Sequence, residues 1–145
     1  MRLVVQRVNF AKVLVGERVV GKIDKGILVY LGISRSFCDD KLDWMVDKIL
    51  KLRLWGSDKK GFDLNVRDIG GEILVVSEFT LFGDCKRGTK PNFANSGDYD
   101  FAKKYYEEFI EKLKYSGVNV ESGEFGSMMR VVSENDGPVT LLLEK

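Results

Sequence analysis

Residues 27–33 read Ile27-Leu28-Val29-Tyr30-Leu31-Gly32-Ile33, a run in which nearly every position is apolar. A strand with one solvated face alternates apolar and polar residues, whereas a strand buried on both faces is apolar throughout. We therefore expect this run to form a central strand of a sheet, covered on both sides by other parts of the chain.

Further strands are expected on both sides of this central run, at residues 2–8, 12–15, 18–23, 73–82, 118–121, 129–134 and 139–144. Gly16-Glu17 lies between two Val-rich runs, which is typical of a two-residue type II′ hairpin. Gly70-Gly71 is expected to separate one more strand from the strand that begins at Ile73.

Two segments have the 3.6-residue periodicity of amphipathic helices. The first is expected from Asp39 to Leu52. The second is expected from Gly97 to Ser116, with Ser96 as its N-cap and Gly117 as its C-terminal stop. The order of elements predicts one α/β domain over residues 1–145, with a largely antiparallel or mixed sheet. Two main helices packed on one side of it would give α/β/β layers.

Composition excludes several classes of function. The 23 basic and 22 acidic residues give a net charge of +1, which excludes a strongly basic nucleic-acid coat but leaves room for a local RNA-binding patch. No apolar run approaches the roughly 20 residues that span a membrane, and no signal-peptide core follows Met1. We expect a cytoplasmic protein with neither a membrane nor a DNA partner.

The chain contains no histidine, which excludes Ser-His-Asp and Cys-His catalysis and any histidine-based metal site. Its two cysteines, Cys38 and Cys85, form no Cys-X-X-Cys pair and are expected to be free thiols. No metal or other cofactor is expected. The chemistry must then come from carboxylates, hydroxyls, backbone N–H groups or the substrate itself.

Three segments are candidates for function. Ser77-Glu78-Phe79-Thr80-Leu81 ends an apolar run, and its hydroxyls require hydrogen-bond partners or an open pocket, although Thr80 also simply suits a strand. Asn135-Asp136-Gly137-Pro138-Val139-Thr140 contains Asp-Gly between strand-like runs, which is ordinarily a hairpin turn. A basic loop, formed by Lys86, Arg87 and Lys90, suits phosphate contacts, although such loops are more often only solvated.

The first two of these segments resemble, in the expected order, the two signatures of the D-aminoacyl-tRNA deacylase family. Residues 70–81 are similar to its Ser-Gln-Phe-Thr-Leu signature, residues 135–140 to its Gly-Pro motif, and the opening residues 1–8 to its N-terminal strand. The resemblance extends from end to end of the chain. It implies a homodimer that hydrolyses the ester of D-aminoacyl-tRNA, and of glycyl-tRNA formed on tRNA(Ala).

The resemblance also implies roles for particular residues. Gly137-Pro138 of one subunit would enter the other subunit's pocket as a cis peptide, hold the substrate's α-amino group and reject L side chains by steric exclusion. Gln6 and Arg7 would brace that motif. Backbone N–H groups near Ser77 and Phe79 would stabilise the oxyanion. The basic loop would bind tRNA, with Phe79 available to stack on the terminal adenine.

Thr80 is a tempting nucleophile, but its hydroxyl needs a base and no histidine exists. The interpretation that we favour is substrate assistance, in which the terminal 2′-hydroxyl activates water. Glu78 departs from the family's usual Gln, and a carboxylate pointing into the pocket would alter its electrostatics. Two rival hypotheses remain: a non-catalytic tRNA-binding dimer of the same fold, and a hydrolase of small molecules that uses Thr80 as nucleophile.

Overall fold

β1 (Arg2–Val15) is the strand around which the sheet is organised. The computed structural model describes residues 1–58 and 61–145. The other strands are β2 (Arg18–Ile23), β3 (Gly26–Gly32), β4 (Glu72–Ser77), β5 (Val120–Ser122) and β6 (Arg130–Glu144), and the helices are α1 (Leu42–Lys51) and α2 (Tyr99–Lys114). Two short 3-10 helices, η1 (Asp39–Lys41) and η2 (Phe79–Phe82), complete the fold.

The sheet is mixed, with strand order β2-β1-β3-β4-β5 and β6 paired with β1 as well. The first half of β1 pairs with β3 and the second half with β2, while β6 pairs antiparallel along both halves. The pairs β3–β4 and β4–β5 are parallel. At Gly21 the backbone of β2 comes so close to Ser122 of β5 that an added Cβ would lie 2.4 Å from the Ser122 carbonyl oxygen. The sheet is therefore nearly closed on itself.

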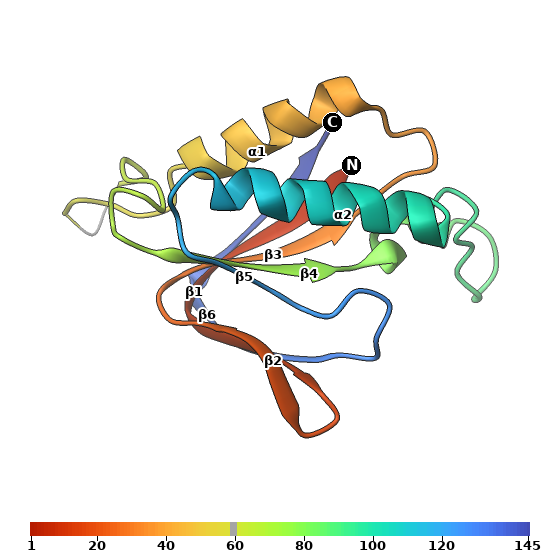
Figure 1. The fold of residues 1–145 in the computed structure, drawn as a ribbon, viewed down its shortest axis with the longest axis horizontal. Helices are drawn as coiled ribbons and strands as arrows, with labels where there is room; N and C mark the ends of the chain where they lie inside the picture. The colour runs from red at the N-terminus through yellow and green to blue at the C-terminus, as the bar shows by residue number, and fades with distance from the viewer. Residues whose placement is uncertain (59–60) are drawn as a thin grey trace.

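Both helices cover the same face of the sheet, and the β1–β2 hairpin curls beneath the opposite face (Figure 1). Apolar side chains of α1 and α2 pack against one face of β3 and β4, including Val29, Leu31 and Val75. A second core forms between the other face, including Leu28 and Leu74, and the curled part of β1 and β2. The expected α/β/β layering and the burial of the central run on both faces are confirmed.

Four sequence-based expectations about strands are wrong. Residues 2–8 and 12–15 form one continuous strand, and so do residues 129–134 and 139–144, because both halves of β6 pair with the same long β1. Between α1 and Gly70 the described residues contain no strand, only an isolated bridge that joins Trp55 and Leu64. The strand that begins near Ile73 ends at Ser77, because η2 then crosses over Gly32, where an added Cβ would lie 3.2 Å from Leu81 Cβ.

The helices agree with expectation except at their starts. The first turn of the first helix is 3-10, and α1 proper begins at Leu42. Asp98 occupies the N-cap position of α2, whereas Ser96 donates its hydroxyl to the Phe79 carbonyl at 3.0 Å. Gly117, with φ of 81°, follows α2 as expected. None of the helices in the described part of the chain has the length and hydropathy needed to cross a membrane.

Candidate functional site at the open end of the sheet

A cavity of roughly 570 Å³ lies where β4 continues beyond the end of β5. It is lined by the Ser77–Thr80 segment, by one side of α2 and by the loop between β5 and β6. Ser77, Glu78, Phe79 and Thr80 all contribute to its wall, so the structure brings the residues of the first signature together in one pocket.

Backbone N–H groups without an acceptor among the described residues lie along the cavity wall. The Glu78 N–H donates to Leu31 of β3 at 2.8 Å, so the Ser77 N–H, one residue earlier in the strand, points to the opposite edge. Phe79 and Thr80 are the first two residues of η2, and their N–H groups have no acceptor among the described residues. The cavity wall therefore presents main-chain donors that a substrate carbonyl can use.

Thr80 and Glu78 contact each other at the cavity wall: the Thr80 hydroxyl donates to Glu78 Oε1. The sequence argument considered only histidine as a base for Thr80, whereas in the structure a carboxylate lies against its hydroxyl. The signal was present in the sequence, since Glu78 stands two residues before Thr80. Burial and the neighbouring Glu78 carboxylate also raise the pKa of Tyr30 on β3.

An aromatic wall, formed by Tyr99, Tyr106 and Phe125, closes the cavity on the α2 side. Tyr106 donates its hydroxyl to the Val75 carbonyl at 2.9 Å, and burial raises its pKa. Gly126, which follows Phe125, has a φ of 78°, and an added Cβ there would lie 2.8 Å from the Tyr99 hydroxyl oxygen. Sequence reasoning missed this wall; the available signal was a glycine followed closely by paired methionines, Met128 and Met129.

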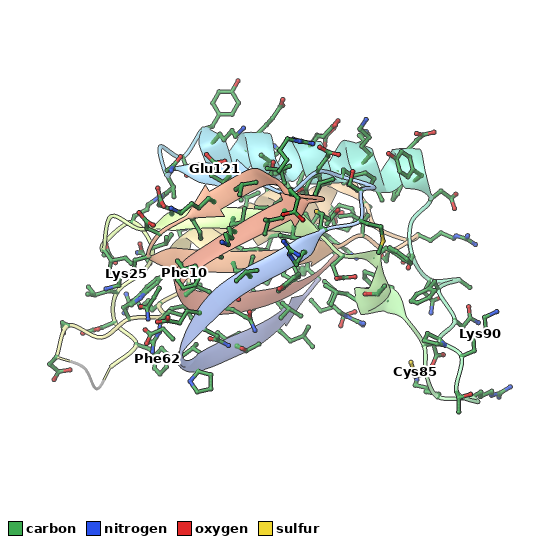
Figure 2. The ribbon with its side chains drawn as sticks, turned by 90° about the horizontal axis from the view of Figure 1, so that it is seen from below. Phe10, Lys25, Phe62, Cys85, Lys90 and Glu121 are labelled. Carbon is green, nitrogen blue, oxygen red and sulfur yellow. The ribbon has the colours of Figure 1, made fainter. Side chains whose placement is uncertain are left out.

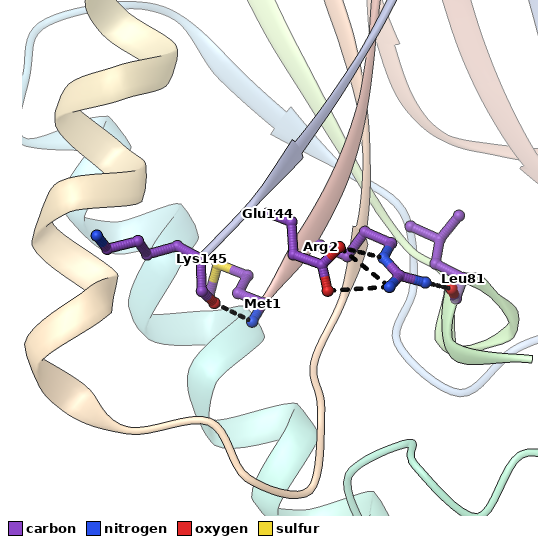
Figure 3. Close-up of polar contacts among 5 residues, drawn as sticks. All are labelled: Met1, Arg2, Leu81, Glu144 and Lys145. Atoms are coloured by element: carbon purple, nitrogen blue, oxygen red, sulfur yellow. Dashed lines mark hydrogen bonds and ion pairs between the residues drawn. The ribbon is translucent and has the colours of Figure 1, made fainter.

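Arg2 anchors the far end of η2 (Figure 3). Its guanidinium donates to the Leu81 carbonyl, pairs with Glu144 at 2.9 Å and lies 4.8 Å from the centre of the Phe82 ring. Beside it, the Met1 amine donates to the Lys145 carbonyl at 2.9 Å. The ends of β1 and β6 thus fix the segment that forms the cavity wall.

The basic loop follows η2 and is exposed throughout. Figure 2 shows Cys85 and Lys90 at the opposite end of the molecule from Lys25 and Phe62. Both cysteines are free and exposed. In the described structure Lys86, Arg87 and Lys90 form no ion pair, so their charges are available to a ligand. Phe79 is 58% exposed on the cavity side of this loop, with its ring against Phe93 at 5.1 Å.

Gly137 and Pro138 lie elsewhere, in a bulge of β6 formed by residues 136–139 opposite Arg7 alone. This segment is not the expected hairpin turn, because the chain continues in the same direction along β1. The Gly137-Pro138 peptide is cis, as the family resemblance implied, and Gly137 has φ of 120°. Both residues are exposed, and neither they nor Gln6 nor Arg7 line the cavity of their own chain.

Arg7, on β1 opposite the bulge, holds the bulge in place through its guanidinium. Its Nε lies 3.0 Å from an Asp136 carboxylate oxygen and donates to the Asp136 carbonyl at 3.2 Å, while Nη1 donates to the Leu54 carbonyl at 2.6 Å. An added Cβ at Gly137 would lie 2.8 Å from Arg7 Nη2, so no side chain fits there without displacing the guanidinium. Gln6 donates to the Thr140 hydroxyl at 3.2 Å.

In this single-domain α/β fold, a cavity edged by main-chain donors is the kind of site with which hydrolases bind a substrate carbonyl. The family model for D-Tyr-tRNA(Tyr) deacylase matches residues 4–144, and the chain belongs to this family. The resemblance drawn from the two signatures is therefore confirmed.

Individual relatives are similar to this chain over nearly their full lengths. The D-aminoacyl-tRNA deacylase of Trichodesmium erythraeum is 50% identical, covering 100% of this chain and 97% of its own. That of Clostridioides difficile is 48% identical, covering 99% and 97%. The solved structure of a c-Myc DNA unwinding element binding protein has a TM-score of 0.93 at 40% identity, covering 100% and 99%. A probable eukaryotic D-amino acid tRNA deacylase shares the fold, with a TM-score of 0.81 at 18% identity, covering 98% and 97%.

Proposed function

We propose that this protein hydrolyses the ester bond of D-aminoacyl-tRNA, and of glycyl-tRNA, while sparing L-aminoacyl-tRNA. The observation that carries the proposal is the cavity formed by Ser77–Thr80, with its free main-chain donors, in a member of this family. Because the substrate is aminoacyl-tRNA, the proposed place of action is the cytoplasm.

In the proposed reaction, the ester carbonyl lies against the N–H groups of Ser77 and Phe79. Water adds to the carbonyl carbon, and the 2′-hydroxyl of the terminal ribose assists by accepting its proton. The negative charge that develops on the carbonyl oxygen is stabilised by the two N–H groups. The bond to the ribose 3′-oxygen then breaks, and that oxygen takes the proton that the 2′-hydroxyl passes on, leaving a free amino acid and tRNA.

Chiral selection is proposed to come from a second copy of the chain, whose Gly137-Pro138 carbonyls would hold the α-amino group. In support, the bulge is exposed and held by Arg7, yet Gly137 and Pro138 do not line the Ser77–Thr80 cavity of their own subunit. β6 also exposes apolar side chains unusual for a free surface, including Leu142 at 61%. In a site closed by this bulge, an L side chain would clash, whereas hydrogen or a D side chain would not.

tRNA binding is assigned to the basic loop, which follows the cavity wall directly in sequence and whose cations form no ion pair in the described structure. Phosphates of the single-stranded 3′ end would meet these cations while Phe79 offers a ring to the terminal adenine.

The first test is a parallel time course on D-tyrosyl-tRNA, L-tyrosyl-tRNA and glycyl-tRNA. We expect loss of the D and glycyl esters with the L ester spared. Sparing of all three esters, with tRNA still bound, would instead support a non-catalytic tRNA-binding dimer.

A separate test asks whether two subunits together form each active site, by mixing two variants that are each expected to lose most of their activity. Phe79→Pro removes a cavity donor, and Gly137→Ala disturbs the bulge by contact with Arg7. If each cavity uses the bulge of the other copy, heterodimers regain one intact site and activity returns on mixing. Absence of recovery, with heterodimers shown by native mass spectrometry, would place cavity and bulge in separate roles.

A second mechanism is favoured by the contact between Thr80 and Glu78. Glu78 would accept the hydroxyl proton while Thr80 Oγ1 attacks the ester carbonyl carbon. As the bond to the ribose 3′-oxygen breaks, that oxygen would take the proton from Glu78 and tRNA would leave, giving an acyl-threonine that water then hydrolyses. Substrate assistance remains the preferred proposal, because it needs neither a histidine nor a covalent intermediate on the protein. Mass spectrometry of rapidly quenched reactions decides: an acyl adduct on Thr80 supports the second mechanism, and its absence during turnover supports the first.

A further inference from the structure

Glu78 is the one charged side chain among the described residues that line the cavity. The remaining lining residues are apolar, aromatic, hydroxyl-bearing or glycine. No lysine or arginine of the described chain forms an ion pair with Glu78. A carboxylate without a protein cation, in a largely apolar pocket, is suited to a cationic group on the ligand.

The orientation of Glu78 fits this role. Glu78 directly follows β4, and its side chain lines the same cavity as Val76, Met129 and Val131. Oε1 accepts the Thr80 hydroxyl, which fixes the carboxylate at the wall. No donor from the described chain reaches Oε2, and an ionised carboxylate has lone pairs for several further hydrogen bonds.

We propose that Glu78 binds the α-ammonium group of the aminoacyl ester. This inference rests on the proposed function, because it places the ester carbonyl against the neighbouring Phe79 N–H. In an amino acid the nitrogen lies about 2.5 Å from the carbonyl carbon, so a carbonyl at residue 79 brings the ammonium group beside residue 78. An ammonium group has three N–H donors, and Glu78 Oε2 accepts one. Two donors remain for the Gly137-Pro138 carbonyls of a second copy.

The contact predicts a particular kinetic signature. The ammonium charge is the same in the bound ester and in the transition state, so its partner contributes uniform binding and acts on KM rather than kcat. Glutamine, the usual family residue, is nearly isosteric with Glu78 and keeps an acceptor oxygen but has no charge. Glu78→Gln therefore removes the ionic part of the contact while leaving the main-chain donors of the cavity wall in place.

The experiment compares two substrates in two proteins. One substrate is D-tyrosyl-tRNA; the other is the same tRNA carrying the matching α-hydroxy acid, in which a hydroxyl replaces the ammonium group. For the unaltered protein we expect KM to rise on the order of 10- to 100-fold on this replacement, the range for a hydrogen bond between charged groups. For Glu78→Gln we expect the rise to shrink to a few-fold. Glu17→Gln, on the exposed β1–β2 turn, is the matched control and should behave as the unaltered protein.

Each outcome is decisive. If Glu78→Gln changes KM equally for both substrates, or changes kcat alone, the ammonium contact is refuted. If the unaltered protein hydrolyses both esters with the same KM, the cavity does not sense the charge and the inference also fails. Failure of the unaltered protein to hydrolyse D-tyrosyl-tRNA at all is a different result, because it overturns the proposed function itself.

Discussion

Replacing Phe79 by proline removes one main-chain donor from the cavity wall without removing any hydrogen bond that the described structure makes. The Phe79 N–H has no acceptor among the described residues, and the Phe79 carbonyl, which accepts from Ser96, is retained. The first residue of a 3-10 helix has a φ near −60°, which proline also adopts. Glu78, at φ −145° and ψ 84°, is outside the helical region that a following proline disfavours. The fold should therefore tolerate the change.

The expected loss is large. Removing one donor to a developing oxyanion lowers kcat by on the order of 10²–10³, or about 2.7–4 kcal/mol. Phe79→Ala is the matched control, because it removes the same exposed ring but keeps the N–H. If the ring stacks on the terminal adenine, both variants lose about 1–3 kcal/mol of binding, which appears in KM.

The assay is single-turnover hydrolysis of D-tyrosyl-tRNA by each variant, with saturating enzyme so that kcat is read separately from binding. Circular dichroism melts confirm that the two variants fold alike. We expect Phe79→Pro to be at least 100-fold slower than Phe79→Ala. Equal rates for the two would refute the assignment of this N–H to the oxyanion.

Four further expectations follow. Thr80→Ala should keep measurable turnover under substrate assistance; complete inactivity in a folded, tRNA-binding variant would contradict it. Arg7→Lys should lower the free energy of unfolding in urea by about 1–3 kcal/mol, since the buried Leu54 carbonyl loses its donor and lysine lacks the fork to replace it. Neutralising the three cations of the basic loop should raise KM and reduce the slope of log KM against log salt by about 2; an unchanged slope would place tRNA elsewhere. Burial raises the pKa of Tyr106, so above about pH 10 this tyrosine ionises in the unfolded state before it does in the folded state, and the free energy of unfolding falls as the pH rises. Tyr106→Phe should therefore lose less stability between pH 7 and pH 11, as measured by urea titrations at the two pH values.

The parts of the fold that could be predicted from sequence are those set by local pattern. The apolar run at residues 27–33 and the two amphipathic helices fall within a few residues of their expected positions. The hairpin turn that we expected at residues 135–140 does not form, and there is a physical reason why the sequence suggested it. Asp-Gly-Pro between two strand-like runs has the same local composition whether the runs pair with each other or both pair with a third strand. Only the length of β1, which is available to both, distinguishes the two arrangements.

In the candidate site too, features set by local sequence could be predicted and features set by tertiary packing could not. The motif residues that line the cavity are neighbours in sequence, so they could be identified together. The aromatic wall comes from α2 and the β5–β6 loop, and it depends on how these elements pack. Ser96 illustrates the difference in one residue: its position before a helix suggests an N-cap, yet its hydroxyl holds the Phe79 carbonyl across a tertiary contact.

The pairing of β1 with β6 also has a consequence for biosynthesis. Arg2 meets Glu144 across 142 positions of the chain, so β1 is synthesised well before β6 becomes available as its partner. Until then one whole edge of β1 lacks its partner, and an unpaired strand edge is a template for association with other chains. Contacts this distant in sequence also slow folding. The Gly137-Pro138 bulge lies opposite Arg7 of β1, so it takes its shape only when β6 pairs with β1.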